Sequence, residues 1–323
     1  MMTYRAPLFG RFTGQLPVGP LPFSALKAFF PQYPMAERVA TYAVLGGIPA
    51  YLERFDPAQS LSQNIRQQLF QRTGMFRSEP TVLVTELVRE TRIYETMLRA
   101  IAAGQHTAGE IAGAVGLSSS NIQPYLKRLI ALKLIERRVP ATLPLSERQA
   151  SKRSRYHVLD AFLRFYYRFI EPHAEIIEQG LVETLWGEIG EQFRAFIGMT
   201  VFEELCRRWV IAQARQQALP FLPETVGSHW AADAQVDVVA VNWREKKLLL
   251  GECKWGEHAV GQAVIRELVE KAPLVSPGPE WQVYYAFFTR AGFTDAARAE
   301  AQRHQAWLVD LAQLEAALAG ANL

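Results

Sequence analysis

The stretch "QVDVVAVNWREKKLLLGECK", residues 235–254, contains two short apolar runs separated by the polar sequence WREKK. Apolar runs of this length on either side of a polar turn predict a β-hairpin with strands Val236–Asn242 and Leu248–Lys254. Each strand carries one acidic residue, Asp237 or Glu252, at a position where a core strand normally carries an apolar side chain. The hairpin therefore predicts a fold that contains a sheet. Its two acidic side chains need a positively charged group nearby.

The register of this hairpin decides how the two acids meet. If Arg244 and Glu245 form a two-residue turn, Asp237 lies directly opposite Glu252, with Cβ atoms about 5 Å apart. Like charges at that distance destabilise a sheet unless a cation neutralises them, and Mg²⁺ favours sites with one or two carboxylates and several waters. A register slip of one residue would place the acids on opposite faces, so the metal hypothesis depends on the turn.

Residues next to the acids extend this hypothesis. Lys254 lies two residues after Glu252 and is predicted to share its face of the strand, whereas Cys253 points to the other face. Cys253 is interpreted as a small buried residue whose backbone carbonyl is a further candidate metal ligand. Glu203 interrupts an apolar helical face in "GMTVFEELCRRWV" and is a candidate fourth ligand, whereas the adjacent Glu204 is interpreted as solvated.

A helix-turn-helix pattern precedes the hairpin. The helix "YETMLRAIAAG" stops at Gly104, and "TAGEIAGAVG" begins with a capping box formed by Thr107 and Glu110. Gly116 then allows a tight turn, and Ser118–Lys133 is predicted to be a recognition helix. Because "LIERRVP" and "SRYHVLD" read as two short strands, the pattern predicts a winged helix-turn-helix; a winged helix used only for protein contacts is the alternative.

Basic residues are concentrated in and around the predicted wing. The net charge of the whole chain is only +3, so the local concentration of basic residues, not the net charge, indicates a binding surface. Such a patch favours contact with a phosphate backbone, although a solvated loop would have a similar composition. The candidate DNA contacts are Lys127, Arg128, Arg137, Arg138, Lys152, Arg153 and Arg155.

The whole chain is predicted to be an α+β protein with several domains. Its 323 residues suggest two or three domains, and apolar and charged fractions of 49% and 21% are ordinary for a globular protein. Two cysteines, no apolar run of about 18 residues and no signal-peptide pattern lead to the expectation of a cytoplasmic protein without membrane association. The expected segments are a helical N-terminal segment at 1–60, a helical linker at 61–90, the winged helix at 91–158, an aromatic connector helix at 159–187, and an α/β domain at 188–323 that includes one long helix from about 188 to 218.

These residues resemble two known families. "VFEE", "VDVV" and "GECKW" are similar to the motif series of PD-(D/E)xK nucleases, which have a restriction-endonuclease-like fold. The chain from about 46 to 297 resembles the C-terminal half of a family of archaeal and bacterial AAA-type ATPases, with "GGIPAYL" as the ATPase lid, "RYHVLDAFLRFYYRFIEP" in the winged helix and "FFTRAGFT" in the nuclease-like part. The resemblance implies that Asp237, Glu252 and Lys254 are catalytic and that Glu203 is the helix acid. It also implies that residues 1–60 are a remnant of the ATPase lid.

One departure from this family affects the expected activity. No G-x-x-x-x-G-K-[ST] sequence occurs in the chain, so ATP hydrolysis is not expected. Three functions stay open: an Mg²⁺- or Mn²⁺-dependent DNA endonuclease, a DNA-binding regulator or scaffold that does not cut, and a subunit of a separately encoded ATPase. The expected partner is double-stranded DNA, with that ATPase and a second copy of the chain as further candidates.

Overall fold

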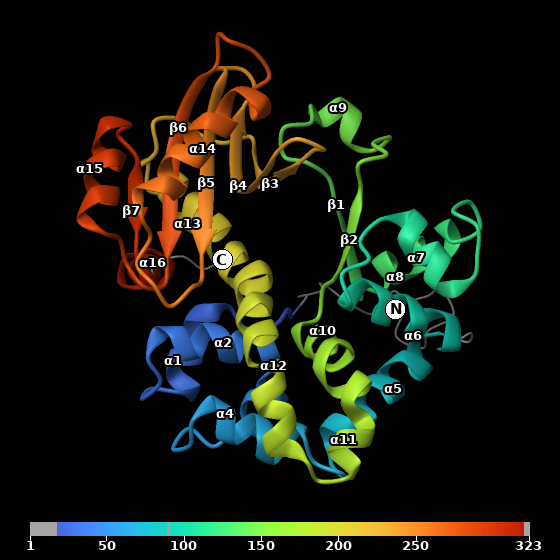
Figure 1. Ribbon diagram of the computed structural model, residues 1–323. Coiled ribbons are helices and arrows are strands. Elements are labelled where there is room, and N and C mark those ends of the chain that lie inside the picture. Colours follow the sequence, from blue (N-terminus) through green and yellow to red (C-terminus); the bar gives the residue numbers. More distant parts are fainter. Residues whose placement is uncertain (1–17, 89–90, 320–323) are drawn as a thin grey trace, which may run out of the picture.

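The computed structural model describes residues 18–88 and 91–319 of the chain (Figure 1). It is a mixed α and β structure with a helical N-terminal part and a five-stranded mixed sheet near the C-terminus. Within the described ranges, no helix is long and apolar enough to cross a membrane. The first 17 residues of the predicted lid remnant lie outside the described part.

The N-terminal part is built from short helices. They are η1 (Phe23–Ala25), α1 (Leu26–Phe29), α2 (Met35–Leu45), α3 (Pro49–Leu52), α4 (Leu61–Asn64), η2 (Ile65–Leu69) and α5 (Met75–Leu87). Helix α2 ends at Gly46, whose φ of 63° suits a residue without a side chain, and Pro49 begins α3. Helix α5 continues through Pro80. Because proline has no backbone N–H, one hydrogen bond of the helix is missing at this residue.

Three helices and a two-stranded sheet follow. They are α6 (Thr91–Ala102), α7 (Ala108–Val115), α8 (Gln123–Ala131), β1 (Ile135–Arg138) and β2 (Arg155–Val158), with α9 (Leu145–Arg148) between the strands. The predicted capping box of α7 is confirmed: the Thr107 side chain accepts from Glu110 N–H, and the Glu110 side chain accepts from Thr107 N–H. Helix α8 is shorter than predicted, because Ser118 accepts from Asn121 N–H in a turn before the helix starts. We refer to residues 135–158 as the arm.

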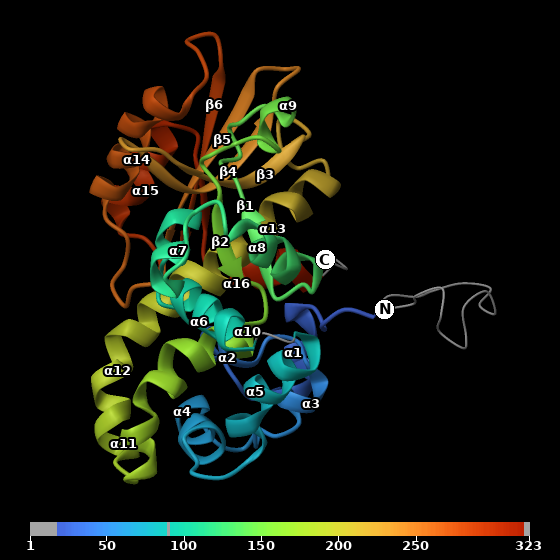
Figure 2. The same cartoon turned by 90° about the vertical axis from the view of Figure 1, so that its right-hand side faces the viewer.

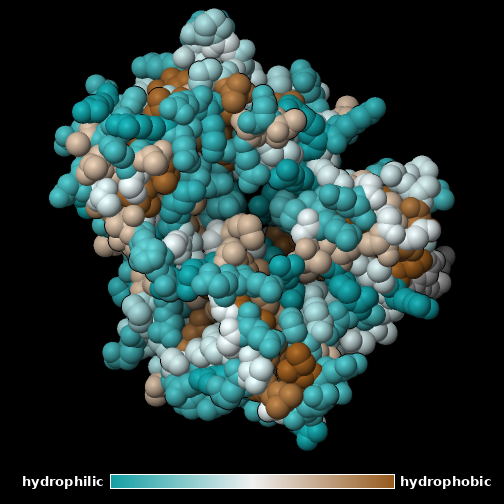
Figure 3. All heavy atoms as spheres, in the orientation of Figure 1, coloured by the Kyte–Doolittle hydropathy of each residue, from teal (hydrophilic) through white to brown (hydrophobic). Residues whose placement is uncertain are grey.

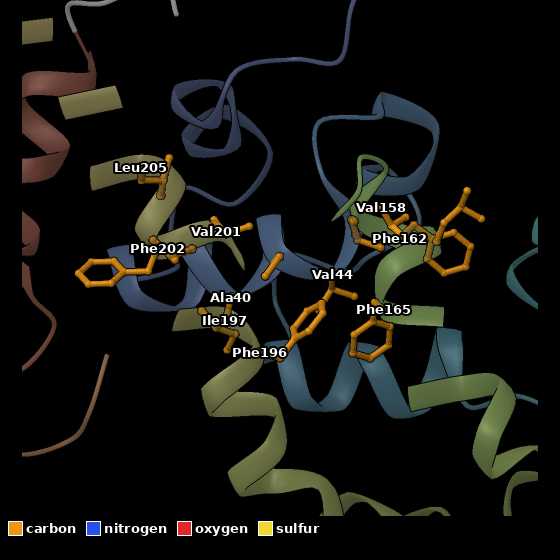
Figure 4. Close-up of a cluster of buried hydrophobic side chains, with 14 of the residues drawn as sticks. Ala40, Val44, Val158, Phe162, Phe165, Phe196, Ile197, Val201, Phe202 and Leu205 are labelled. Carbon is orange, nitrogen blue, oxygen red and sulfur yellow. The ribbon is translucent and has the colours of Figure 1, made fainter. Parts of the chain in front are cut away.

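The middle of the chain contains interrupted helices. They are α10 (Ala161–Phe165), η3 (Tyr166–Ile170), η4 (Glu171–His173), α11 (Ala174–Glu178), α12 (Val182–Ile197), η5 (Gly198–Phe202) and α13 (Glu203–Arg215). The long helix predicted from about 188 to 218 corresponds to a continuous helical run from Val182 to Arg215, in which the wider π-helical turn η5 separates α12 from α13. The aromatic side chains of α10 and α12 are core residues, and Figure 4 shows Phe165 and Phe196 beside Val44 of α2.

The C-terminal sheet has helices on both faces. Its elements are β3 (Thr225–Trp230), β4 (Gln235–Asn242), β5 (Lys247–Lys254), α14 (Gln262–Val275), β6 (Gln282–Thr289), α15 (Asp295–Arg303), β7 (Trp307–Val309) and α16 (Leu311–Ala319). The strand order is β3-β4-β5-β6-β7; β3, β4 and β5 are antiparallel neighbours, whereas β5, β6 and β7 run parallel. Val238 and Ala240 pack in the core that includes α13 and α16, and Val239 and Val241 pack toward α14 and α15.

The arm reaches across to the edge strand β3, as both views show (Figures 1 and 2). Ala141 N–H donates to Ser228 O at 2.8 Å, and Thr142 Oγ1 lies 2.7 Å from Nδ1 of His229. Trp230 Nε1 donates to Arg153 O at 3.1 Å. These contacts cover part of an edge whose backbone groups lack a neighbouring strand. The loop at 139–154 is thus attached to β3 near both of its ends.

Candidate functional site

The Asp237–Glu252 hairpin has the predicted register but a longer turn. Strands β4 and β5 pair Val238 with Gly251 and Asn242 with Lys247, which is the register that places Asp237 opposite Glu252. The turn takes in residues 243–246, so the prediction of a two-residue turn at Arg244 and Glu245 is wrong. The extra turn residues are added symmetrically and leave the pairing unchanged.

A β-bulge in β4 sets the position of Asp237. Strand β3 pairs Gly227 with Val239 and His229 with Val236, so residues 237–238 of β4 stand opposite Ser228 alone. The bulge explains why Val236 and Val239 pack in the same core, although strict alternation would place them on opposite faces. Bulges of this kind re-aim side chains and are common beside functional sites.

The Asp237 carboxyl has specific partners in the bulge. Its Oδ2 accepts from Cys253 N–H at 3.0 Å, and its backbone carbonyl accepts from Arg207 Nη1 at 3.0 Å. Burial and, to a smaller extent, the charge of Glu252 raise the pKa of Asp237 to about 6, against the lowering effect of the Cys253 amide and of Lys254. Asp237 and Glu252 therefore crowd each other electrostatically, as the sequence predicted for a cross-strand acid pair.

Glu252 and Lys254 lie side by side on β5. Lys254 Nζ donates to Glu252 Oε1 at 2.7 Å, which confirms that the two side chains share a face of the strand. The Glu252 side chain is 13% exposed, whereas that of Lys254 is 42% exposed, so the ammonium group lies on the solvent side of the carboxylate. Cys253 faces the other way, toward Cys206 of α13, and burial raises the pKa of the Cys253 thiol.

Glu203 is the first residue of α13, and it lines the same cavity as Asp237. Burial and, to a smaller extent, the charge of Asp237 raise the pKa of Glu203 to about 8, against the lowering effect of Arg207. The Arg207 side chain is 8% exposed and lies 3.4 Å from Glu203 Oε2. It also lies 3.3 Å from Glu204 Oε2. Sequence reasoning missed Arg207, although its spacing of four residues from Glu203 places both on one helix face.

These residues fit a divalent cation only in part. Asp237 and Glu252 supply oxygen ligands of the type that Mg²⁺ prefers, and their mutual repulsion is what a cation relieves. Among the residues that the structure describes, however, no group of three or more His, Cys, Asp and Glu side chains is arranged to hold a metal ion. Asp237 interacts with Glu203 on one side and with Glu252 on the other, so the predicted ligands form two overlapping pairs.

The predicted DNA-contacting residues do not form one surface. Lys127, Arg128, Lys152 and Arg153 are exposed, and Lys127 and Lys152 line one groove between α8 and the arm. Arg137 lines the same groove, where its Nε donates to Ser154 Oγ at 2.8 Å and its Nη2 donates to Ser151 O at 3.0 Å. Its role as a DNA contact stays a prediction, whereas Arg138, its neighbour in the strand, faces the opposite side of the arm.

Arg138 and Arg155 face a central cavity on the other side of the arm. The two residues pair across β1 and β2, and the Arg155 guanidinium lies 4.9 Å from the ring centroid of Trp230. The same cavity is lined by Asp237 and Glu203, so these arginines and the acids share one space of about 530 Å³. Sequence reasoning did not anticipate this cavity, because it separated the arm and the sheet into different domains.

Comparisons with known proteins give a family match without an assigned activity. A solved structure of Can2 from Sulfobacillus thermosulfidooxidans in complex with cyclic tetra-adenylate aligns with 76% of this chain and 55% of that chain, at 15% identity; its TM-score of 0.27 is too low to indicate a shared fold. The chain is 34% identical over 288 residues to the uncharacterized protein MJECL04 of Methanocaldococcus jannaschii. That alignment covers 88% of this chain and 63% of the relative, so the chain spans less than two thirds of the relative's length. Residues 166–265, which run from η3 into α14 and include Glu203, Asp237, Glu252 and Lys254, match the DUF234 family, described as archaeal and bacterial proteins of unknown function.

Proposed function

We propose that this protein is a metal-dependent endonuclease of the PD-(D/E)xK type that hydrolyses phosphodiester bonds in DNA. The observation that carries the proposal is the Asp237 carboxyl, set in a β-bulge with its pKa raised by burial and by Glu252, next to the Lys254–Glu252 pair. Two crowded carboxylates beside an ammonium group have a use at a scissile phosphate, whereas a purely structural strand has no need of them.

In this proposal each residue has a separate role. Asp237 and Glu252 would hold Mg²⁺ or Mn²⁺, which when bound polarises a phosphoryl oxygen and lowers the pKa of water. The Lys254 ammonium, on the solvent side of Glu252, is placed to orient the attacking water or to offset charge in the transition state. Arg207 holds the backbone of Asp237 in position, and the Cys253 amide fixes the orientation of its carboxylate.

The helices α6–α8 and the arm are proposed to be a winged helix-turn-helix that holds duplex DNA. The exposed Lys127 and Arg128 on α8 and the exposed Lys152 and Arg153 on the arm loop support this assignment. Removing such phosphate contacts weakens binding at all sequences and reduces its salt dependence. We therefore expect Lys152→Ala with Arg153→Ala to flatten the salt dependence of duplex binding.

Cleavage of plasmid and oligonucleotide DNA tests the proposal. We expect nicking or cutting with Mg²⁺ or Mn²⁺, none in EDTA, and a loss of at least about a hundredfold for Asp237→Asn or Glu252→Gln with DNA binding kept. Glu270→Gln, at an exposed position of α14, is the matched control and should cut like the wild type. Equal cutting by wild type and Glu252→Gln would refute the assigned site.

A second candidate is a DNA-binding scaffold, or a subunit of a separately encoded ATPase, that does not cut. The observation that favours it is the direct Lys254–Glu252 contact, because the ammonium group already neutralises one proposed metal ligand. DNA binding without cleavage on any substrate, together with no calorimetric signal for Mg²⁺ or Mn²⁺, would support this alternative.

A further inference from the structure

The central cavity lies between the arm and the sheet, where Figure 3 shows the surface hollowed near its centre. Its volume of about 530 Å³ is within the range of about 300–1,000 Å³ that is usual for ligand sites. The walls come from β1 and β2 of the arm, from α10 and η3, and from α12, α13 and the start of β4. Residues 228–230 of β3 line it as well, so segments distant in sequence converge on one cavity that opens to the surface.

Positive charge predominates in this cavity. Four arginines line it, against the two carboxyl groups of Glu203 and Asp237. The arginines are Arg138, Arg155, Arg164 and Arg168. Arg138 is paired with Glu136, and Arg168 donates to Ala103 O at 3.1 Å. The cavity therefore has cationic donors in excess of the anionic groups around it.

Arg164 has the most unusual surroundings of these side chains. Its Nε is shielded from solvent and has no hydrogen-bond partner among the residues described. Burial, together with the nearby charge of Arg138, lowers the pKa of Arg164 to about 10, against the raising effect of the Asp160, Glu136 and Glu204 carboxylates. A buried charged donor without a partner is destabilising, and guanidinium groups match phosphate oxygens in geometry. An anion in the cavity would relieve both the missing hydrogen bond and the repulsion between the two arginines.

The opposite wall offers a second donor or acceptor and an apolar surface. His229 is 5% exposed, and its Nε2 is buried without a partner in the described part of the chain, while Nδ1 contacts Thr142. Phe196 and Trp230 also line the cavity beside the arginines: the Arg164 guanidinium lies 5.9 Å from the ring centroid of Phe196, and that of Arg155 lies 4.9 Å from the ring centroid of Trp230. A basic groove combined with aromatic side chains is the arrangement by which proteins hold single-stranded nucleic acid. A cavity of about 530 Å³ is of the size that holds a small ligand or a short strand segment, and it is too small for a duplex.

We propose that the central cavity binds a single-stranded segment of nucleic acid, with a phosphate group held by Arg138, Arg155 and Arg164 and the strand passing Asp237. The inference deepens the proposed function by naming a strand end, flap or unpaired stretch as the substrate, and only its cleavage aspect rests on that function. Lys127 and Lys152 line a groove on the other side of the arm, so duplex and single-strand contacts would use different surfaces.

Fluorescence anisotropy in EDTA tests the inference without any cleavage. The probe is a fluorescein-labelled single-stranded oligonucleotide, compared with its duplex and with a nucleoside monophosphate as competitor. We expect Arg155→Gln and Arg164→Gln each to weaken single-strand binding by about tenfold or more and duplex binding much less. Arg164→Lys should retain part of the affinity, and Arg303→Gln, an exposed change on α15, should bind like the wild type.

The outcomes separate this inference from the nuclease proposal. Circular dichroism and the melting temperature identify any variant that fails to fold. If Arg164→Gln does not fold, the test uses Arg155→Gln and Arg168→Gln in its place. Unchanged single-strand binding in folded cavity variants would overturn the inference even if the wild type cuts DNA. Loss of binding in those variants would support it even if no cleavage is found. Full competition by the monophosphate, with no higher affinity for the oligonucleotide, would overturn the strand assignment.

Discussion

At the scale of single residues, the acids of the site are held where ionisation is unfavourable. Glu203 and Asp237 are largely buried, and each carries a pKa raised above its ordinary value, to about 8 and about 6. Arg207 offsets this in part through contacts with Glu203 and with the Asp237 carbonyl. The site is therefore destabilising to the metal-free fold whenever the acids are charged.

The first prediction concerns the pH dependence of stability. The folded-state pKa of Glu203 lies near 8, above the ordinary value of 4.5 that the unfolded chain has. The unfolded state therefore loses its proton first, so the free energy of unfolding should fall as the pH rises from about 5 to about 8, by on the order of 3 kcal/mol at most. Glu203→Gln should remove most of that decline in thermal melts in EDTA. Glu188→Gln, at an exposed position, is the control, and an identical slope in Glu203→Gln would contradict the assignment.

The second prediction concerns Gly251, which pairs with Val238 next to the site. A Cβ at Gly251 would lie 2.9 Å from Val238 Cβ and 3.2 Å from Phe288 Cε2, so Gly251→Ala forces two packed side chains apart. Overpacking of this kind destabilises by about 1–3 kcal/mol. Gly256→Ala is the matched control, because no atom lies within 4 Å of its Cβ position. Urea denaturation of both variants measures the difference; equal stability would show that the sheet adapts.

At the scale of secondary-structure elements, the sequence was informative where one local pattern decides the structure. The hairpin register, the capping box of Thr107 and the two arm strands follow from alternation, side-chain capping and turn residues within a few positions. The bulge at Asp237 could not be predicted, because it depends on how β4 pairs with β3, a strand that was itself missed. The π-helical turn η5 was missed because a π turn and an α turn share similar apolar spacing.

In the candidate site, too, only the features that depend on local sequence patterns could be predicted. The same-face placement of Glu252 and Lys254 follows from strand periodicity and is confirmed by their contact. The approach of Arg155 and Arg164 to the acids depends on long-range packing of the arm and α10. A local signal existed in "AFLRFYYRFI", where Arg164 and Arg168 stand four residues apart in an apolar run and so share a helix face.

The third prediction is that Trp230 holds the arm on β3. The indole N–H donates to Arg153 O, and Arg155 stacks on the ring, so Trp230→Ala removes both contacts. Hydrogen exchange should then become faster across 139–154, while exchange in β4 and β5 stays slow. Leu145→Ala, at a position that is 62% exposed, serves as the control and should leave exchange in the arm unchanged. Equal protection of the arm in Trp230→Ala and wild type would show that the other docking contacts suffice.

At the scale of the whole molecule, the predicted segments share one hydrophobic core. The cluster that begins at Phe23 in η1 continues through the arm and α10 and ends at Leu318 in α16. Helix α16 packs back on the N-terminal helices, where Glu315 pairs with the buried Arg38 and lies 3.6 Å from Lys27. The boundary proposed at residue 188 therefore divides a packed core, unlike the exposed linkers at which independent domains separate.

The fourth prediction follows from this shared core. A fragment of residues 188–323 would expose Phe196, Ile197 and Val201, which in the full chain pack against α2 and α10 (Figure 4). Burial of each such side chain contributes about 1.5–3 kcal/mol, so their exposure would remove a large part of the stability of an ordinary domain. We expect the full chain to melt in one cooperative transition and the fragment to show broad melting, dye binding to exposed apolar surface and poorly dispersed amide resonances. A fragment that melts sharply and gives a dispersed spectrum would show that the sheet and its helices fold alone, and the cavity arginines would then belong to a separable partner domain.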